Sequence, residues 1–290
     1  MSRSDWARLI LLSCLWGGSF LFVERLVAEL PPLTIVLGRV ALGALVLAAV
    51  LAGSGARWPR GLQVWRTLAV MGVLNNLIPF TLFAIAQGGI SAGLAAILNA
   101  TTPLFTLLAL RIFSGTPLGA LRLAGVAAGF GGVALMMGAG ATAGTRLAIG
   151  CCLAAAMSYG VSAVWAQRFR RLGVQPLQAA FGQITASALM LAPLALLIDR
   201  PWTLALPSPG AWGALAGVAV LSTALAYLIY FRIAASAGAV ALSLVTFLIP
   251  ISALAMSAAL TGTLPQPHHL MGMALIAAGL GLIELARRRN

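Results

Sequence analysis

The chain has 290 residues, of which 61% are hydrophobic and 8% are charged, and its mean hydropathy is +1.02. A soluble domain carries roughly 25% charged residues, so this composition excludes a water-soluble protein. All eighteen basic residues are arginines, and they lie between long apolar runs instead of forming one basic stripe. That placement argues against a nucleic-acid partner, and the chain is predicted to be an all-α integral membrane protein.

A helix that crosses the hydrocarbon layer needs about 20 apolar residues. Ten stretches between Arg, Pro and Gly clusters meet this requirement: 6–24, 33–53, 65–85, 90–110, 119–138, 147–166, 176–197, 211–231, 239–260 and 269–286. The first could be a secretory signal peptide, but it is longer than the apolar part of such peptides and lacks a small-x-small cleavage site. We therefore interpret all ten as membrane spans.

The arginines predict the orientation of these spans, because cytoplasmic loops of membrane proteins are rich in basic residues. With a cytoplasmic N-terminus, fourteen of the eighteen fall on the cytoplasmic side: Arg3, Arg8, Arg57, Arg60, Arg66, Arg111, Arg122, Arg168, Arg170, Arg171, Arg232 and Arg287 to Arg289. Arg25, Arg146 and Arg200 fall outside, and Arg39 lies within span 2. Both termini are therefore predicted to be cytoplasmic.

The second half of the chain repeats the first. With an offset of 147 residues, seven positions of one half match identical residues of the other: Ala92, Pro103, Leu107, Gly115, Thr116, Gly125 and Gly132 match Ala239, Pro250, Leu254, Gly262, Thr263, Gly272 and Gly279. Offsets of 143 and 144 align spans 1 and 2 with spans 6 and 7. The chain is thus predicted to contain two five-helix repeats, residues 1–143 and 144–290. Because five is odd, the second repeat is inverted, which is typical of secondary transporters with a site near the membrane midplane.

Several segments carry a resemblance to a known family. They are Leu15-Trp16-Gly17-Gly18-Ser19-Phe20, Gly38-Arg39, Ser91-Ala92-Gly93-Leu94-Ala95-Ala96 before Pro103, and Leu248-Ile249-Pro250. In their order and spacing these segments resemble the ten-helix drug/metabolite transporter superfamily of the EamA type, and among its members the YddG-like amino-acid exporters. The resemblance implies that spans 3, 4 and 6 rock against spans 1, 8 and 9 around a central cavity. The family often has a Gly-Glu pair after spans 4 and 9, where this chain has Thr116 and Thr263, so no role of that glutamate is carried over.

The five acidic residues, Asp5, Glu24, Glu29, Asp199 and Glu284, all lie near span ends or in loops. Proton-driven pumps usually hold an ionisable residue inside the membrane, so we expect facilitated or weakly coupled transport. Neither histidine has acidic or thiol neighbours at metal-ligand spacing, and the three cysteines lie in apolar runs. No metal, cofactor or catalytic residue is predicted.

Arg39 is the one charge well inside a span. Its side chain could reach the headgroups, or it could face the protein interior and hold a carboxylate. The offset of 144 residues places Gln183 at the corresponding position of span 7. This correspondence favours an inward, hydrogen-bonding site, so Arg39 and Gln183 are a candidate polar pair of the cavity.

Aromatic and polar residues near mid-span are the candidate substrate-binding residues, because the resemblance implies that their helices face the centre. They are Trp16, Ser19, Phe20, Asn76, Phe80, Phe83, Asn99, Tyr159, Ser162, Trp165, Tyr227, Tyr230, Ser243 and Thr246. A polar side chain in hydrocarbon is costly unless it is paired, so each could equally serve an interhelical hydrogen bond. The predicted pocket is mostly apolar, with aromatic walls and neutral polar groups.

Pro103 and Pro250 interrupt spans 4 and 9 at corresponding places and are candidate hinges, because proline removes a helical hydrogen bond. Glycines in spans 5 and 10 allow close helix approach, either within the chain or in a dimer. We expect a functional monomer, with a dimer left open.

These features, together with the resemblance, predict a secondary transporter of the bacterial inner membrane that exports amino acids, including large neutral and aromatic ones, or related small metabolites. A nucleotide-sugar, sugar-phosphate or drug exporter of the same superfamily is the alternative, although no pair of buried cations is available for a phosphate. A membrane-embedded lipid-modifying enzyme is more remote, because it would need a His, Asp or Glu cluster at one interface.

Overall fold

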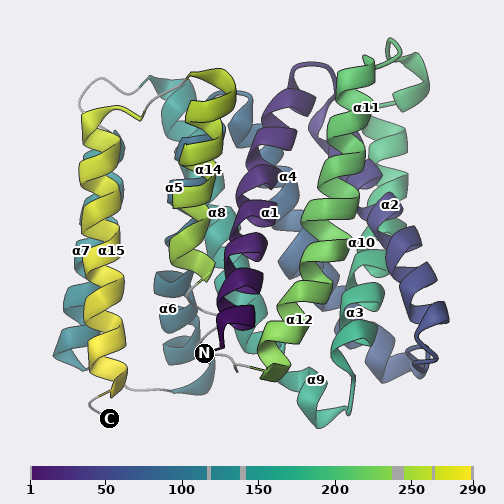
Figure 1. Cartoon of the computed structure of the whole chain (residues 1–290), viewed down its shortest axis with the longest axis horizontal. Coiled ribbons are helices and arrows are strands. Elements are labelled where there is room, and N and C mark those ends of the chain that lie inside the picture. Colours follow the sequence, from purple (N-terminus) through teal and green to yellow (C-terminus); the bar gives the residue numbers. More distant parts are fainter. Residues whose placement is uncertain (1, 116–118, 138–141, 237–244, 263–264, 289–290) are drawn as a thin grey trace.

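The computed structural model describes residues 2–115, 119–137, 142–236, 245–262 and 265–288. These residues form antiparallel helices (Figure 1), and spans 3, 4, 6 and 8 each contain more than one helical segment. In the first half the segments are α1 (Arg3–Val27), α2 (Pro32–Gly53), α3 (Leu62–Gly72), η1 (Val73–Leu77), α4 (Ile78–Gln87), α5 (Ala92–Asn99), α6 (Thr102–Ser114) and α7 (Ala120–Met137). In the second half they are α8 (Ala143–Trp165), α9 (Gln167–Arg171), α10 (Pro176–Ile198), η2 (Pro201–Thr203), α11 (Pro209–Ala216), η3 (Gly217–Leu225), α12 (Ala226–Ser236), α14 (Val245–Thr261) and α15 (Pro267–Arg288).

The predicted all-α membrane fold is confirmed. Seven helical spans are long and apolar enough to cross a membrane, and three shorter apolar helices cover 120–135, 248–260 and 267–283. Each predicted span therefore corresponds to a helix or to a run of helical segments. Residues 239–244 of the predicted ninth span lie outside the described residues.

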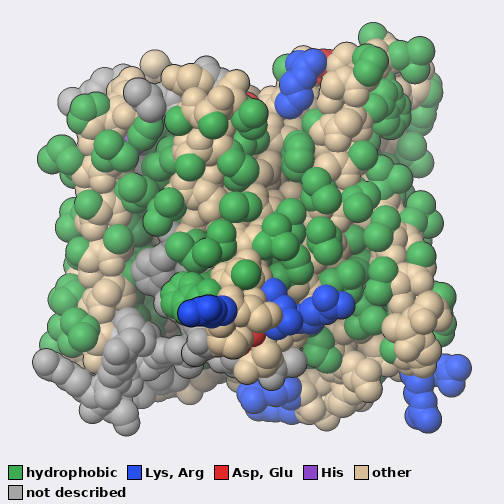
Figure 2. All heavy atoms as spheres, in the orientation of Figure 1, with side chains coloured by type: hydrophobic (Ala, Val, Ile, Leu, Met, Phe, Trp, Pro, Cys, Tyr) green, Lys and Arg blue, Asp and Glu red, His purple; other side chains and the backbone are tan. Residues whose placement is uncertain are grey.

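The surface of the molecule fits a lipid environment. Figure 2 shows hydrophobic side chains over most of the visible face, with the basic side chains gathered mainly near its lower edge. Both termini lie toward that edge (Figure 1). We call this the terminal end of the bundle and the opposite side the far end.

Glycine contacts hold the spans together in pairs that repeat between the two halves. A Cβ atom at Gly17 of α1 would lie 2.9 Å from the backbone nitrogen of Ala253 in α14. The corresponding Gly160 of α8 faces α6 in the same way, since its Cβ would lie 2.7 Å from the backbone nitrogen of Thr106. These glycines let span 1 approach span 9, and span 6 approach span 4, at backbone distance.

The same correspondence holds for spans 2 and 7. A Cβ at Gly38 would meet Leu215 of α11 at 2.9 Å, and a Cβ at Gly182 would meet Leu68 of α3 at 2.5 Å. Residues 68 and 215 differ by the repeat offset of 147. These glycine contacts place span 2 with spans 1, 8 and 9, and span 7 with spans 3, 4 and 6. The two groups also pack against each other along α2 and α10.

Spans 5 and 10 pack against each other as α7 and α15 at one side of the molecule (Figure 1). A Cβ at Gly125 would lie 2.5 Å from the Gly279 carbonyl oxygen, and one at Gly132 would lie 2.6 Å from that of Gly272. All four glycines are buried. The sequence left open whether the glycines of spans 5 and 10 pack within the chain or in a dimer. The structure shows packing within the chain.

Replacing Gly160 with Ala is expected to destabilise the fold by about 1 to 3 kcal/mol, the usual cost of overpacking. Its new Cβ would press on the backbone of Phe105 and Thr106, which cannot rotate away. Gly150→Ala is the matched control in the same helix, because nothing lies within 4 Å of its Cβ position. Thermal unfolding in detergent should show a lower midpoint for Gly160→Ala only. Equal midpoints for the two variants would contradict the close approach of α8 and α6.

Acidic residues cap helices at the far end. Asp199 accepts hydrogen bonds from the backbone and hydroxyl of Thr34 at the start of α2, at 2.7 and 3.0 Å. Glu29 accepts from the backbone and hydroxyl of Ser208 at the start of α11, at 2.7 and 2.8 Å. Carboxylates at helix N-termini are favoured by the free N–H groups and the helix dipole. These acids therefore fix where spans 2 and 8 begin.

The Glu29 contact is expected to depend on pH. Hydrogen bonds from Ser208 and the positive charge of Arg25 lower the pKa of Glu29 below its ordinary value of 4.5. A lowered folded-state pKa means that the carboxylate contributes its full stabilisation above pH 4.5 and loses it as the pH falls through the folded pKa. The protection of the α11 amides from hydrogen exchange, relative to the intrinsic exchange rate at each pH, should fall in that acidic range. Glu29→Gln should show faster exchange without this pH dependence; an unchanged dependence in the variant would point to another group.

Candidate substrate site

Two π-helical segments interrupt spans 3 and 8 at corresponding places. The η1 segment covers Val73–Leu77, and adding the repeat offset of 147 gives residues 220–224, which lie inside η3 (Gly217–Leu225). In η3 the Thr223 hydroxyl donates to the Val218 carbonyl, five residues earlier, at 2.9 Å. Short π segments inside α-helices frequently mark functional sites. Here they lie beside the most polar part of the protein interior.

Asn75 of η1 is the centre of a hydrogen-bond network between four spans. Its amide nitrogen donates to the Gln183 side-chain oxygen at 3.1 Å and to the Tyr227 hydroxyl at 3.0 Å. Its amide oxygen accepts a bond from the Ser162 hydroxyl at 3.1 Å. The network joins spans 3, 6, 7 and 8 through neutral groups only.

Asn76 is fully buried and extends this network toward span 7. Its amide nitrogen donates to the Ser187 hydroxyl oxygen at 3.2 Å, and the Ser187 hydroxyl bonds in turn to the Gln183 carbonyl at 2.7 Å. An amide in an apolar interior costs several kcal/mol unless it is paired. In this structure the Asn76 amide is paired within the protein interior.

Arg39 turns into the protein and is buried. Its Nε donates to the Thr223 hydroxyl oxygen at 3.0 Å, and its guanidinium carbon lies 3.5 Å from the centre of the Phe80 ring. Of the two orientations that the sequence left open, the inward one is observed.

No carboxylate lies within ion-pair distance of Arg39 in the described part of the chain. Asp5 and Glu29 pair instead with Arg8 and Arg25. The candidate pair Arg39 and Gln183 makes no direct hydrogen bond in the described part either. Arg39 bonds instead to Thr223, and Gln183 bonds to Asn75. The two side chains thus face the π segments of spans 8 and 3, which correspond to each other in the repeats.

Aromatic side chains lie beside the amide network in two groups, and within each group the rings contact one another. Phe83 meets Phe20 edge to face at 5.3 Å and stacks on Tyr159 at 6.3 Å. Trp16 meets Tyr230 at 5.8 Å. Phe231 joins Tyr230 to Tyr227, at 5.2 and 6.2 Å. Spans 1, 3, 6 and 8 therefore supply an aromatic wall beside the amide network.

Three of the predicted site residues that the structure describes do not join this group. Trp165 donates its indole N–H to the Thr67 carbonyl at 3.1 Å, near the terminal end. Asn99 contacts Thr102 at the break in span 4, and Thr246 is half-buried at the start of α14. Ser19 is buried within α1, and Ser243 lies outside the described residues.

The position of Trp165 has a simple geometric reason. It follows Tyr159 by six residues, which at 100° per residue places it about 240° around the helix and about 9 Å further along the axis. Tyr159 and Ser162 share a face, but Trp165 points elsewhere. Trp165 therefore lies outside the aromatic and amide cluster.

Three residues of the network were missed from the sequence. Asn75 precedes the predicted Asn76, and it is Asn75 that makes more of the interhelical bonds. Thr223 corresponds to Asn76 under the offset of 147 residues, so the repeat could have identified Thr223 as a candidate site residue. Ser187 follows the predicted Gln183 by one helical turn and could have been found as its neighbour on the same face.

The two corresponding prolines have different surroundings. Pro103 stands in the first turn of α6, directly after α5 ends at Asn99, so span 4 is broken there. Pro250 lies inside the continuous helix α14. Their role as hinges remains a prediction.

The far end of the bundle is closed between the two groups of spans. Glu24 at the end of α1 accepts a hydrogen bond from the backbone nitrogen of Ala92 at 3.0 Å. Gln87 at the end of α4 donates to the Phe20 carbonyl at 2.6 Å. At the terminal end α6 packs mainly against α8, within its own group. Contacts that join span 1 to spans 3 and 4 are thus concentrated at the far end.

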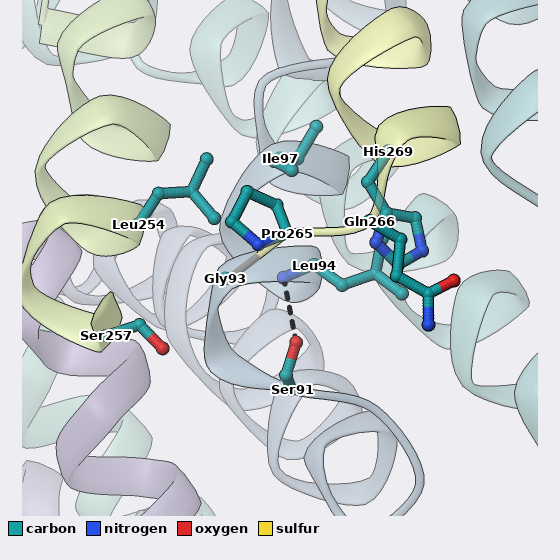
Figure 3. Close-up of a pocket in the computed structure, with 9 residues that line it drawn as sticks. All are labelled: Ser91, Gly93, Leu94, Ile97, Leu254, Ser257, Pro265, Gln266 and His269. Atoms are coloured by element: carbon teal, nitrogen blue, oxygen red, sulfur yellow. Dashed lines mark hydrogen bonds between the residues drawn. The ribbon is translucent and has the colours of Figure 1, made fainter. Parts of the chain in front are cut away.

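A small cavity of about 160 Å³ lies near this closure, between α5, α14 and the start of α15 (Figure 3). Ser91 and Leu94 border one side, and Gln266 and His269 border another. The Ser91 hydroxyl oxygen is occupied as the cap of α5, since it accepts from the Leu94 nitrogen at 3.3 Å. None of the predicted site residues lines this cavity, so it is separate from the aromatic and amide cluster.

Comparisons with known proteins agree with this architecture. The model of the EamA-like transporter family matches residues 6–138 and 146–285. The chain is 23% identical over 280 residues to "Uncharacterized inner membrane transporter YedA" of Escherichia coli K12, covering 96% of this chain and 90% of the relative. The corresponding YedA of Escherichia coli O157:H7 has the same identity and coverage.

A solved structure described only as "Crystal structure of protein" has the same fold. It matches with a TM-score of 0.69 and 20% identity, over 100% of this chain and 99% of the other. The family model covers both halves of the sequence and nearly its whole length. The chain therefore belongs to the EamA-like transporter family of the drug/metabolite transporter superfamily, and its function is membrane transport.

Proposed function

We propose that this transporter exports amino acids, including large neutral and aromatic ones, or related small metabolites, across the bacterial inner membrane by alternating access. The distribution of arginines supports a terminal end that faces the cytoplasm. The far end then faces the periplasm. No cofactor takes part, and one chain is the working unit.

The observation that carries the proposal is Arg39. Its guanidinium is buried beside aromatic rings and neutral amides, and the described residues offer it no carboxylate. A buried charge is stable only with partners, and a planar guanidinium matches a carboxylate with two parallel hydrogen bonds. An amino acid supplies the carboxylate, and a large neutral side chain suits the aromatic wall.

The charge of the site also bears on the alternatives. Arg39 is the single buried arginine among the described residues. A nucleotide sugar or sugar phosphate brings one or two full negative charges on phosphate, for which paired cations would be needed. This supports an amino acid over the phosphorylated substrates of the superfamily. A cationic drug is disfavoured too, since it would meet Arg39.

Alternating access is supported by the corresponding contacts of the two halves. Inverted repeats give a transporter two similar arrangements that open to opposite sides. In this protein the group of spans 1, 2, 8 and 9 and the group of spans 3, 4, 6 and 7 meet along α2 and α10 and at the amide network, and they close at the far end. Rocking one group against the other would open the far end and close the terminal end.

Facilitated transport fits the placement of the acids. The side chains of Asp5, Glu24, Glu29 and Asp199 each accept hydrogen bonds at a helix end. They are engaged in capping and lie away from the amide network. We therefore propose that the substrate gradient drives transport, without a carboxylate proton relay.

Counterflow in proteoliposomes tests the proposal. Vesicles preloaded with one unlabelled amino acid should accumulate the labelled compound, and a screen of the twenty amino acids with sugars and cationic drugs should rank phenylalanine, tyrosine and leucine highest. Exchange of sugars or drugs without amino acids would overturn the substrate class. Uphill uptake driven by a pH gradient alone would overturn the uncoupled mechanism.

A further inference from the structure

A second cavity, of about 280 Å³, opens at the terminal end where spans 4 and 6 finish. One part of its wall is apolar, formed by Phe113 of α6 and by Val161, Val164 and Trp165 of α8. The other part is polar and basic, formed by Ser114 and by Gln167, Arg168 and Arg171 of α9. The cavity therefore has an apolar wall and a cationic rim. Of the predicted substrate residues, Trp165 alone lines it.

The position of Arg168 is fixed by its neighbours. Its guanidinium carbon lies 3.4 Å from the centre of the Trp165 ring. The indole in turn is held by its hydrogen bond to the Thr67 carbonyl, at 3.1 Å. This stacking orients the guanidinium at the rim, where its N–H groups are available to a planar or tetrahedral anion.

The positive charge of the rim is not balanced by acidic residues. Arg168 and Arg171 are exposed, and neither takes part in an ion pair with a carboxylate of the described chain. Phe113, on the apolar side, is 64% exposed. A ligand that matches this pocket has an anionic group near the membrane surface and an apolar part that extends deeper into the membrane.

We propose that this pocket binds an anionic phospholipid of the cytoplasmic leaflet, with its phosphate on Arg168 and Arg171 and one acyl chain along Val161, Val164 and Phe113. Basic pockets between membrane helices on the cytoplasmic side are suited to anionic headgroups. The site lies at the end of α6 and α8, within the group of spans 3, 4, 6 and 7. It is independent of the substrate proposed above.

Native mass spectrometry of the intact transporter with phosphatidylglycerol tests the site. Arg168→Gln with Arg171→Gln is expected to weaken binding of one lipid molecule by about 30-fold, from the usual attraction of two basic residues to an anionic lipid surface. Arg57→Gln with Arg60→Gln is the matched control, because it removes the same charge from another terminal-end loop and spares the pocket. Equal loss in both double variants would overturn the proposal, as would equal binding of phosphatidylcholine.

A second measurement keeps the test independent of folding. Phosphatidylglycerol brominated on its acyl chains should quench the fluorescence of Trp165, and Trp165→Phe should remove that part of the quenching. Brominated phosphatidylcholine should not reproduce it. Inorganic phosphate at millimolar concentration should leave the quenching unchanged, because the acyl chain contributes to binding. Displacement of the lipid by phosphate, or quenching equal for both lipids, would contradict a phospholipid site.

Discussion

Replacing Arg39 with Gln is expected to lower transport of an amino acid by about 10- to 150-fold. Hydrogen bonds to charged groups contribute about 1.5 to 3 kcal/mol, and each 1.4 kcal/mol is a factor of about ten. Gln keeps a hydrogen-bond donor for Thr223 but removes the charge that the substrate carboxylate would meet. Initial rates of counterflow in proteoliposomes measure the effect.

The selectivity of the variant separates substrate binding from structural support. Phenethylamine is phenylalanine without its carboxylate, so the native protein should strongly prefer phenylalanine. In Arg39→Gln this preference should collapse, because the loss falls on the carboxylate substrate alone. A damaged fold would lower both rates together. An unchanged ratio would assign Arg39 to structure and remove it from the substrate site.

Two further variants separate the contributions of the charge, the planar guanidinium and its hydrogen bond to Thr223. Arg39→Lys keeps the charge but loses the planar fork and part of the stacking on Phe80, so intermediate rates are expected. Thr223→Val keeps the guanidinium and removes the acceptor that holds its Nε at 3.0 Å. That variant should raise the substrate concentration for half-maximal rate more than it lowers the maximal rate. Chromatographic behaviour and thermal midpoint in detergent should stay near those of the native protein.

Much of the architecture could be predicted because the membrane restricts the choice. Only helices satisfy all backbone groups within one segment in lipid, so apolar length decides where spans lie. The internal repeat is reflected in the helix pairs, since matched glycines such as Gly17 and Gly160 face matched backbones. Small residues at those positions were visible in the sequence, whereas their partners in the other half required the structure.

The details of the site were less accessible. A π-helical turn shifts all following side chains around the helix axis, and the letters of residues 73–77 do not differ from those of an ordinary apolar helix. Asn75 and Asn76 therefore could not be separated in role by spacing. The contact of Arg39 with Thr223 depends on how spans 2 and 8 cross, and a repeat pattern gives correspondences but no crossing geometry. Trp165 was a candidate because it is aromatic, yet it follows Tyr159 by six residues and so lies about 240° around the helix from it.

Cross-linking the far end is expected to stop transport reversibly. In a background without Cys14, Cys151 and Cys152, the pair Glu24→Cys and Ala92→Cys would carry thiols on opposite sides of the closure, where Glu24 now bonds to the Ala92 nitrogen at 3.0 Å. A short bifunctional thiosulfonate can bridge them. With span 1 tied to span 4, the site could open only toward the terminal end, so counterflow should fall to the level of empty vesicles and return after reduction.

The control tests whether relative motion of the two groups of spans is what the bridge prevents. Ser13 and Ser252 lie within one group, on α1 and α14, with their hydroxyl oxygens 2.8 Å apart. A bridge between Ser13→Cys and Ser252→Cys joins helices that move together under alternating access, and it should leave counterflow intact. Continued transport through a fully cross-linked Glu24→Cys and Ala92→Cys protein would contradict alternating access at this end. Equal inhibition by both bridges would instead show that span 1 moves against span 9, and the grouping of spans inferred from the glycine contacts would have to be redrawn.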